Sequence, residues 1–264
     1  MNYMKNANFR AGVAITSFMM IVILIGLFWT PYDPNAMSGS EKFNPPGLSH
    51  PFGTDNFGRD IFSRVMQGAS ATFAIAAATV AIGLAGGLII GGLTGYYGGW
   101  LDDLLMRIND SILAFPAILL ALVMVAILGK GRMNIIISLG ILFMPSFARI
   151  VRTEVAKQKN TDYVRNAKLM GASDIRILCV HIFPNILTVL LSSVAIGFNN
   201  AVLAEASMSY LGLGVQPPDP SLGRMLNEAQ NFLTRAPWYA ISAGIAIILL
   251  ILGFGLLNEG LSDE

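Results

Sequence analysis

Two neighbouring asparagines and a glutamate stand toward the end of an apolar stretch that runs from about residue 182 to residue 208: Asn199, Asn200 and Glu205. A charge at the centre of a bilayer costs about 2.5–3.5 kcal/mol on insertion scales, so such residues usually face a cavity or a partner. We expect all three to be candidates for lining a path taken by a polar solute. The structural alternatives are helix-to-helix hydrogen bonds for the asparagines and an anchor for the turn at residues 210–218 for Glu205.

Side chains suited to bond-making chemistry are scarce. The sequence has one cysteine and two histidines, His50 and His181, and both histidines lie outside the apolar segments. His50 could ligate a metal with Asp55 or Asp60, but we expect a structural loop residue. The phosphate-binding pattern G-x-x-x-x-G-K-[ST] is absent from the sequence. We therefore expect no catalytic residue, no metal site and no cofactor, and any ATP and Mg²⁺ must be bound by a partner subunit.

The polar segment between about residues 149 and 181 is the most informative part of the chain. Residues 163, 164, 167 and 170 are apolar and form one stripe at helical spacing. Gly171 should end this helix in a left-handed turn, and Ser173 should cap a second short helix. These two short helices would form a rigid protrusion between two spanning helices, which we call the knob. Such a protrusion can transmit a movement of a soluble partner into the membrane. The residues predicted for this contact are Tyr163, Val164, Ala167, Leu169, Met170, Gly171, Ala172, Ser173 and Asp174.

Composition places the chain in a bilayer. Of its 264 residues 54% are hydrophobic and 12% are charged, against about 25% charged in a soluble domain. The net charge of +1 argues against nucleic acid as a partner. Because a spanning backbone must satisfy its own hydrogen bonds, we predict an all-α membrane protein with six transmembrane helices. The predicted segments are 11–30, 71–96, 108–128, 134–151, 182–208 and 237–257.

Orientation follows from the positions of the cations. Seven of the 17 Lys and Arg residues lie in the 149–181 segment, which places that loop in the cytoplasm and, with six spans, both termini there too. The first apolar run is too long for a signal peptide and is read as a retained helix. The expected organisation is a helix in 1–30, an extracellular or periplasmic loop in 31–70, a five-helix core in 71–258 that includes a coupling loop in 152–181, and a cytoplasmic tail in 259–264.

Smaller features predict local packing. Gly87, Gly91 and Gly95 are spaced for close helix contact, either within this subunit or at a dimer face. Pro116 and Pro145 should kink the third and fourth segments. Two amphipathic helices are expected outside the spans. One follows Asp60 and lies along the membrane surface or against a neighbouring helix. The other, in 222–233, belongs to an outer stretch, 210–236, that could dock an external protein or act as a solvated lid.

The polar segment resembles the "EAA" signature of bacterial ABC importer permeases, E-A-A-x3-G-x9-I-x-L-P. Residues 165–167 occupy the first triplet, and Gly171 and Pro184 keep the required spacing. Four positions depart from the signature: Arg165, Asn166, His181 and Phe183. Elsewhere, HPFGTDNFGRD from His50, GYYGGWLD from Gly95 and AEASMSYLGLGVQPP from Ala204 resemble the C-type permease of dipeptide, oligopeptide and nickel ABC importers.

The resemblance implies the ABC importer type I permease fold, in the bacterial cytoplasmic membrane, with the chain forming half of a translocation path. It implies four kinds of partner besides lipid: a second homologous permease, two ATP-binding subunits, an extracellular solute-binding protein and a peptide or nickel/metal-chelate substrate. The alternative is an ion-coupled secondary transporter or a channel that acts without an ATPase. That class should show inverted repeats or ionisable pairs at mid-membrane, and neither is evident.

Overall fold

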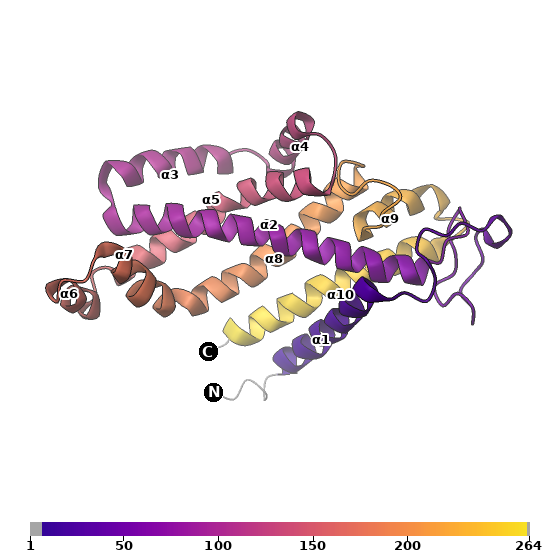
Figure 1. Cartoon of the computed structure of the whole chain (residues 1–264), viewed down its shortest axis with the longest axis horizontal. Coiled ribbons are helices and arrows are strands. Elements are labelled where there is room, and N and C mark those ends of the chain that lie inside the picture. The colour runs from indigo at the N-terminus through magenta and orange to yellow at the C-terminus, as the bar shows by residue number, and fades with distance from the viewer. Residues whose placement is uncertain (1–6, 263–264) are drawn as a thin grey trace. The chain divides into compact units, whose positions relative to one another are not determined.

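The computed structural model describes residues 7–262, and the outermost residues of the predicted 1–30 and 259–264 segments lie outside that range. The described chain is helical, apart from turns, loops and an isolated bridge between Thr54 and Asp60 (Figure 1). It forms two compact units. Unit 1 holds the described residues up to Ala77, Met124–Ile136 and those from Phe198 onward, and unit 2 holds Ala78–Val123 and Ile137–Gly197.

Five described helical stretches are each long and apolar enough to cross a membrane. They are α1 (Ala7–Phe28), α2 (Ile61–Tyr97), α5 (Arg132–Gln158), the stretch Asp174–Tyr210 that ends in α8 (Leu187–Tyr210), and α10 (Pro237–Ser262). A sixth span is reached when α3 (Gly99–Leu113) and α4 (Ala117–Leu128) are counted together. The predicted all-α membrane fold is therefore confirmed.

The third predicted segment, 108–128, is broken rather than kinked. α3 and α4 meet at an angle of 93°, with Pro116 in the gap between them. Proline lacks the amide proton that a helix needs and also disfavours helical geometry in the residue before it. α3 begins as early as Gly99 and carries charged residues, among them Asp102, whose carboxylate accepts two hydrogen bonds of 2.5 Å from Arg152.

The second span begins earlier than predicted. α2 starts at Ile61, so the separate amphipathic helix expected after Asp60 is in fact its first turns. Asp60 caps this end, because its Oδ2 accepts a 2.7 Å hydrogen bond from the backbone N–H of Ser63. Ile61, Val65 and other apolar side chains of these turns are buried, so the apolar face continues without interruption into the span.

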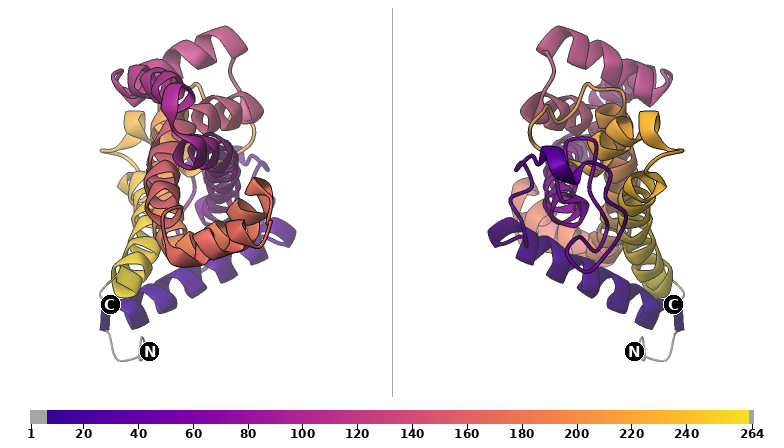
Figure 2. Two further views of the ribbon diagram at one scale, coloured as in Figure 1. Left: turned by 90° about the vertical axis from the view of Figure 1, so that its left-hand side faces the viewer. Right: turned by 90° about the vertical axis from the view of Figure 1, so that its right-hand side faces the viewer.

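Within unit 1, α1 and α10 lie side by side (Figures 1 and 2). Glycines allow the close approach: a Cβ on Gly12 would lie 2.6 Å from the backbone nitrogen of Leu257. α9 (Leu222–Ala229) is capped by Ser221 and continues into the short η5 (Gln230–Phe232), which confirms the helix predicted over 222–233. Residues 259–262 of the predicted tail are helical and belong to α10.

Within unit 2, α2 packs on α5 through the glycine series. A Cβ on Gly95 would lie 2.6 Å from the carbonyl oxygen of Arg152, and Cβ atoms on Gly87 and Gly91 would clash with Phe147 and Ala148 in the same way. Small residues let helix backbones approach closely where packing, rather than water exclusion, holds helices together. Contact within the chain therefore accounts for the spacing of these glycines.

Candidate functional site

The predicted knob is built from short helical pieces at one end of unit 2 (left in Figure 1). They run in the order α6 (Asp162–Leu169), α7 (Asp174–Arg176), the π-helical turn η3 (Ile177–Ile182) and the 3-10 turn η4 (Phe183–Ile186), which leads into α8.

One face of α6 packs inward. Val164 is buried, and Tyr163 and Ala167 are partly buried against a cluster that includes Val155 and Ile182. Met170, the fourth residue of the expected apolar stripe, is 88% exposed and does not share the burial of the other three. Met170 is the residue directly after α6, and its N–H still donates to the carbonyl of Asn166 at 3.0 Å.

The residues that flank the turn between α6 and α7 expose apolar side chains. Leu169, Met170 and Ile175 are 85%, 88% and 73% exposed, and we call these three residues the apolar tip. Exposed apolar side chains that gather in one place mark contact sites for another protein or for a membrane.

The turn that carries the tip has the geometry predicted for it. Gly171 has a φ of +81°, and its N–H donates to the carbonyl of Lys168 at 3.0 Å. Ala172, partly buried, donates to the carbonyl of Ala167 at 3.1 Å. The hydroxyl oxygen of Ser173 accepts from the N–H of Arg176 at 3.4 Å, as expected for a cap.

Asp174 ties the knob to the end of α2. Its carboxylate accepts hydrogen bonds from the hydroxyls of Tyr96 at 2.7 Å and Tyr97 at 3.4 Å. Lys159 donates to the carbonyl of Tyr96 at 3.1 Å. These side chains border a polar cavity of about 330 Å³ in which Lys168 also takes part. The tyrosines were not among the predicted contact residues, although they lie in the G-Y-Y-G-G motif.

Glu205 sits in a closed polar pocket of unit 1. Its side chain is fully buried, and its Oε1 accepts a 2.6 Å hydrogen bond from the hydroxyl of Ser209. The same Ser209 hydroxyl accepts from the N–H of Val215 at 3.3 Å. Thr72 and Ser221 stand beside the carboxylate, where Thr72 also accepts from a backbone N–H of α9. Through Oε1 and Ser209 the side chain is tied to the turn at residues 210–218, which supports the anchoring role, whereas Oε2 is buried and has no hydrogen-bond partner among the described residues.

The two asparagines differ in their surroundings. Asn200 is exposed, whereas Asn199 is partly buried. The Oδ1 atom of Asn199 is buried and has no hydrogen-bond partner among the described residues. An unsatisfied acceptor at this depth is available to a polar solute or to another helix.

A buried ion cluster, which the sequence reasoning missed, fastens the loop before α2 to α9 and α10. Arg59 donates to Asp55 at 2.6 Å and to Glu228 at 2.8 Å, Arg64 donates to Glu228 at 3.3 Å, and the hydroxyl of Tyr239 donates to Glu228 at 2.8 Å. Arg64 is fully buried. We refer to Asp55, Arg59, Arg64, Glu228 and Tyr239 as the ion cluster.

Neighbouring charges determine the pKa shifts of Glu228 and Arg59 in the ion cluster. Burial alone would raise the pKa of Glu228, but the cationic side chains of Arg64 and Arg59 outweigh burial and lower it below the ordinary value of 4.5. Burial would likewise lower the pKa of Arg59, and the carboxylates of Asp55 and Glu228 raise it instead. Glu228 and Arg59 are thus held ionised by their partners.

His50 has a structural setting. Its Nδ1 lies 2.8 Å from Asp60 Oδ1, and its ring packs on Tyr32 with centroids 4.8 Å apart. No group of three or more His, Cys, Asp or Glu side chains in the described part of the chain is arranged to hold a metal ion. The geometry favours the loop role over metal ligation for His50.

The fold defines a multi-pass membrane protein, with five or six candidate spans in the described part of the chain. Residues 87–263 match the family of binding-protein-dependent transport system inner membrane components, and the chain belongs to this family.

Named relatives agree with that class. The chain is 39% identical over 251 residues to a dipeptide transport system permease protein of Alkalihalophilus pseudofirmus, covering 95% of this chain and 82% of the relative. It is 42% identical over 260 residues to a glutathione transport system permease protein of Escherichia coli, covering 96% of this chain and 86% of the relative. The inward-facing MetNI methionine ABC transporter has a similar fold, with a TM-score of 0.62 at 19% identity over 74% of this chain and 93% of that chain.

These findings confirm the predicted class. The chain is a multi-pass permease subunit of an ABC importer in the bacterial inner membrane. In this family ATP hydrolysis belongs to a partner subunit, and a solute-binding protein takes part in transport.

Proposed function

We propose that this chain forms half of the translocation path of a peptide importer. The other half would come from a second, homologous permease, and two ATP-binding subunits would drive the pair. An extracellular solute-binding protein would deliver the substrate. The names of the relatives, which refer to dipeptide and glutathione transport, support a short peptide as the substrate class.

The observation that carries the coupling role is the apolar tip. Leu169, Met170 and Ile175 project from a knob whose other face is packed into the cluster around Val155 and Ile182. A displacement of the tip would therefore be transmitted to α5 and to the start of α8 through packed side chains, not through a flexible loop. We propose that the ATP-binding subunits grip this tip on the cytoplasmic side. ATP and Mg²⁺ would be bound by those subunits, and this chain would need no cofactor.

The proposed path includes Asn199 and Asn200. Asn199 offers a buried acceptor, and Asn200 is exposed on the same helix. Glu205, which was predicted with them, is assigned the anchoring role because Ser209 and Val215 occupy its surroundings. Alternating access would then follow from movement of the knob, which rocks the spans attached to it.

The test is uptake of a labelled dipeptide by vesicles that contain both permeases, the binding protein and, in one arm only, the ATP-binding subunits. Uptake that requires those subunits and ATP supports the proposal. Uptake by the permeases alone would instead identify a channel or an ion-coupled carrier.

A matched pair of variants tests the tip. Met170→Asp should abolish most uptake, because a carboxylate replaces an apolar contact that the ATP-binding subunit must desolvate. Leu48→Asp, at a fully exposed loop position away from the knob, is the control and should transport normally. Equal uptake by both variants would remove the tip from the mechanism.

A further inference from the structure

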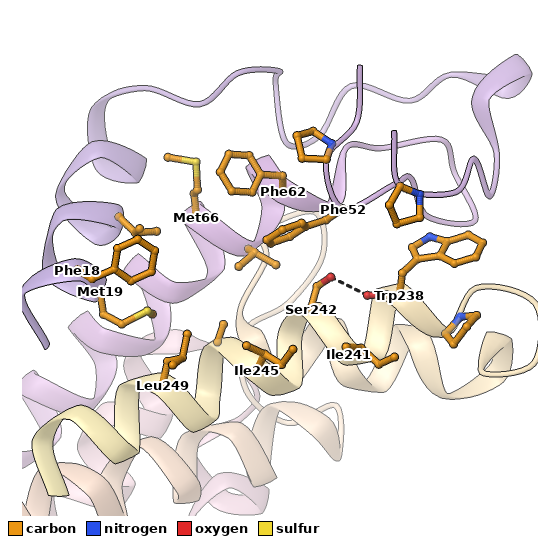
Figure 3. Close-up of a pocket in the computed structure, with 16 residues that line it drawn as sticks. Phe18, Met19, Phe52, Phe62, Met66, Trp238, Ile241, Ser242, Ile245 and Leu249 are labelled. Atoms are coloured by element: carbon orange, nitrogen blue, oxygen red, sulfur yellow. Dashed lines mark hydrogen bonds between the residues drawn. The ribbon is translucent and has the colours of Figure 1, made fainter. Parts of the chain in front are cut away.

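Unit 1 contains an apolar cavity that the transport role does not use. Its volume is about 450 Å³, within the range of roughly 300–1,000 Å³ that ligand sites occupy. Phe18 and Met19 of α1, Phe62 and Met66 of α2, and Ile245 of α10 line its walls (Figure 3).

The end of the cavity is closed by the loop that precedes α2. Pro51 and Phe52 complete the lining there, and the loop rests on Trp238 at the start of α10. Gly53 has a φ of +72°, and a Cβ at this position would lie 2.7 Å from Nε1 of Trp238, which shows how closely the two are packed. Phe52 and Phe62 also contact each other edge to face, with centroids 5.0 Å apart. The cavity is thus shaped by packed side chains and is already formed.

The lining offers no free polar group to a ligand. The hydroxyl of Ser242 donates to the carbonyl of Trp238 in its own helix at 2.6 Å (Figure 3). The indole N–H of Trp238 donates to the carbonyl of Thr54 at 3.5 Å. A water molecule needs two to four polar partners, so water does not fill such a site well. A polar headgroup or a peptide would lose its hydrogen bonds there.

The position of the walls indicates where a ligand enters. Phe18, Ile241 and Ile245 are exposed and belong to α1 and α10, which are both spanning helices. The cavity therefore opens toward hydrocarbon. A flexible hydrocarbon chain can enter and follow the walls.

We propose that this cavity binds one acyl chain of a membrane phospholipid. The chain enters between α1 and α10 and lies against Met19, Met66 and Ile245, with its end beneath Phe52. Methionine side chains suit this role because they adapt to an irregular, mobile partner. The bound chain supplies the dispersion contacts that an empty cavity would forgo.

The experiment uses the assembled transporter in vesicles of phosphatidylcholine that carries a photoreactive diazirine at the acyl terminus. After detergent washing to remove bulk lipid, the sample is irradiated and adducts are mapped by mass spectrometry.

We expect adducts on Phe18 and Ile245 to form even after washing, and adducts on Leu24 to be absent. Leu24 is exposed on α1 but faces away from the cavity, two positions beyond Val22. The same lipid with its diazirine on the headgroup should leave the cavity unlabelled.

Two serine variants provide a matched comparison. Ser242→Leu fills the cavity with apolar volume and should lose most of the retained adducts. Ser193→Leu, at a serine that likewise donates to the carbonyl four residues earlier in its own helix, should keep them. Ala246→Val, at another lining residue, replaces Ser242→Leu if that variant fails to assemble.

Three outcomes would overturn the proposal. Equal retention at Leu24 and Ile245 would mean general solvation by lipid. An unlabelled cavity in the assembled transporter would mean that a side chain of the second permease fills it. Retained labelling in both filling variants would place the acyl chain elsewhere.

Discussion

At the scale of single residues, the stability of the subunit should be most sensitive to substitutions in the ion cluster, because its charged side chains are buried. Arg64 is fully buried and donates to the carbonyl of Pro34 at 3.1 Å as well as to Glu228. Arg165 pairs with Asp162 at 3.8 Å, and both side chains are largely exposed. The two arginines differ in desolvation, which decides what each contributes to stability.

Arg64→Leu should therefore destabilise the subunit severely. Removing one partner of a buried ion pair costs up to about 3–5 kcal/mol, and here Arg59 and Tyr239 would still compensate part of the charge on Glu228. Arg165→Leu should cost at most about 1 kcal/mol, as exposed pairs usually do. The thermal unfolding midpoints of the purified transporters measure the difference. Coinciding midpoints for the two variants would show that the cluster adds little.

The lowered pKa of Glu228 predicts how acid acts on the cluster. The unfolded chain takes up this proton at a higher pH than the folded chain does. The stabilisation is therefore complete above the ordinary value of 4.5 and is lost as pH falls below it toward the folded pKa. Glu228→Gln should be less stable than the parent at neutral pH, and the gap should narrow in acid. Unfolding midpoints followed from about pH 7 to about pH 3 test this, and a gap that widens in acid would reverse the sign.

At the scale of the elements, a substitution at Gly171 would test the backbone conformation of the turn alone, without a change in side-chain packing. A Cβ at this position would meet nothing within 4 Å, so only the left-handed φ of +81° opposes a side chain. For a β-branched residue this conformation is a true outlier, and it costs about 1–2 kcal/mol even for ordinary L-residues. The apolar tip should lose its position while the rest of unit 2 keeps its packing.

Gly171→Val should uncouple ATP hydrolysis from uptake while leaving the subunit in the membrane. Gly171→Asn is the control, since asparagine adopts the left-handed region more readily. ATPase activity and uptake are measured on the same vesicles, together with the amount of subunit in the membrane fraction. Normal uptake by the valine variant would count against the coupling role.

Some elements follow from local sequence and others do not. The spans were predictable because a bilayer demands long apolar helices, and the Gly171 turn and Ser173 cap because both are local backbone chemistry. The break at Pro116 was underestimated, since sequence alone does not tell whether neighbouring helices hold a helix that contains proline together.

The ion cluster joins residues more than a hundred positions apart in the chain, and the exposure of Met170 depends on where α6 stops. Those features are decided by tertiary packing.

At the scale of the whole molecule, the membrane orientation can be tested with the chain's own chemistry. Cys179 is the sole cysteine in the sequence, and its side chain is exposed in η3. The positive charges of the 149–181 segment predict that Cys179 lies on the cytoplasmic side.

A membrane-impermeant maleimide should therefore label Cys179 only after the cells are permeabilised. The control is Leu48→Cys in a Cys179→Ser background, which should react in intact cells because Leu48 is fully exposed and the 31–70 loop is predicted to face the exterior. Reaction of Cys179 in intact cells would invert the topology and remove the tip from the reach of any cytoplasmic ATPase.

The π-helical turn at Ile177–Ile182 has a consequence for how force travels. Its hydrogen bonds follow a different register from those of α8, and η4, with Pro184 near its start, follows it directly. Proline offers no N–H, so the backbone here is softer in bending than an ordinary helix. Burial of Ile177 and Ile182 supplies the stiffness that the backbone lacks. We therefore expect substitutions at Ile177 and Ile182 to change how efficiently the proposed movement of the knob reaches α8. This effect should be independent of how tightly the ATP-binding subunits bind the apolar tip.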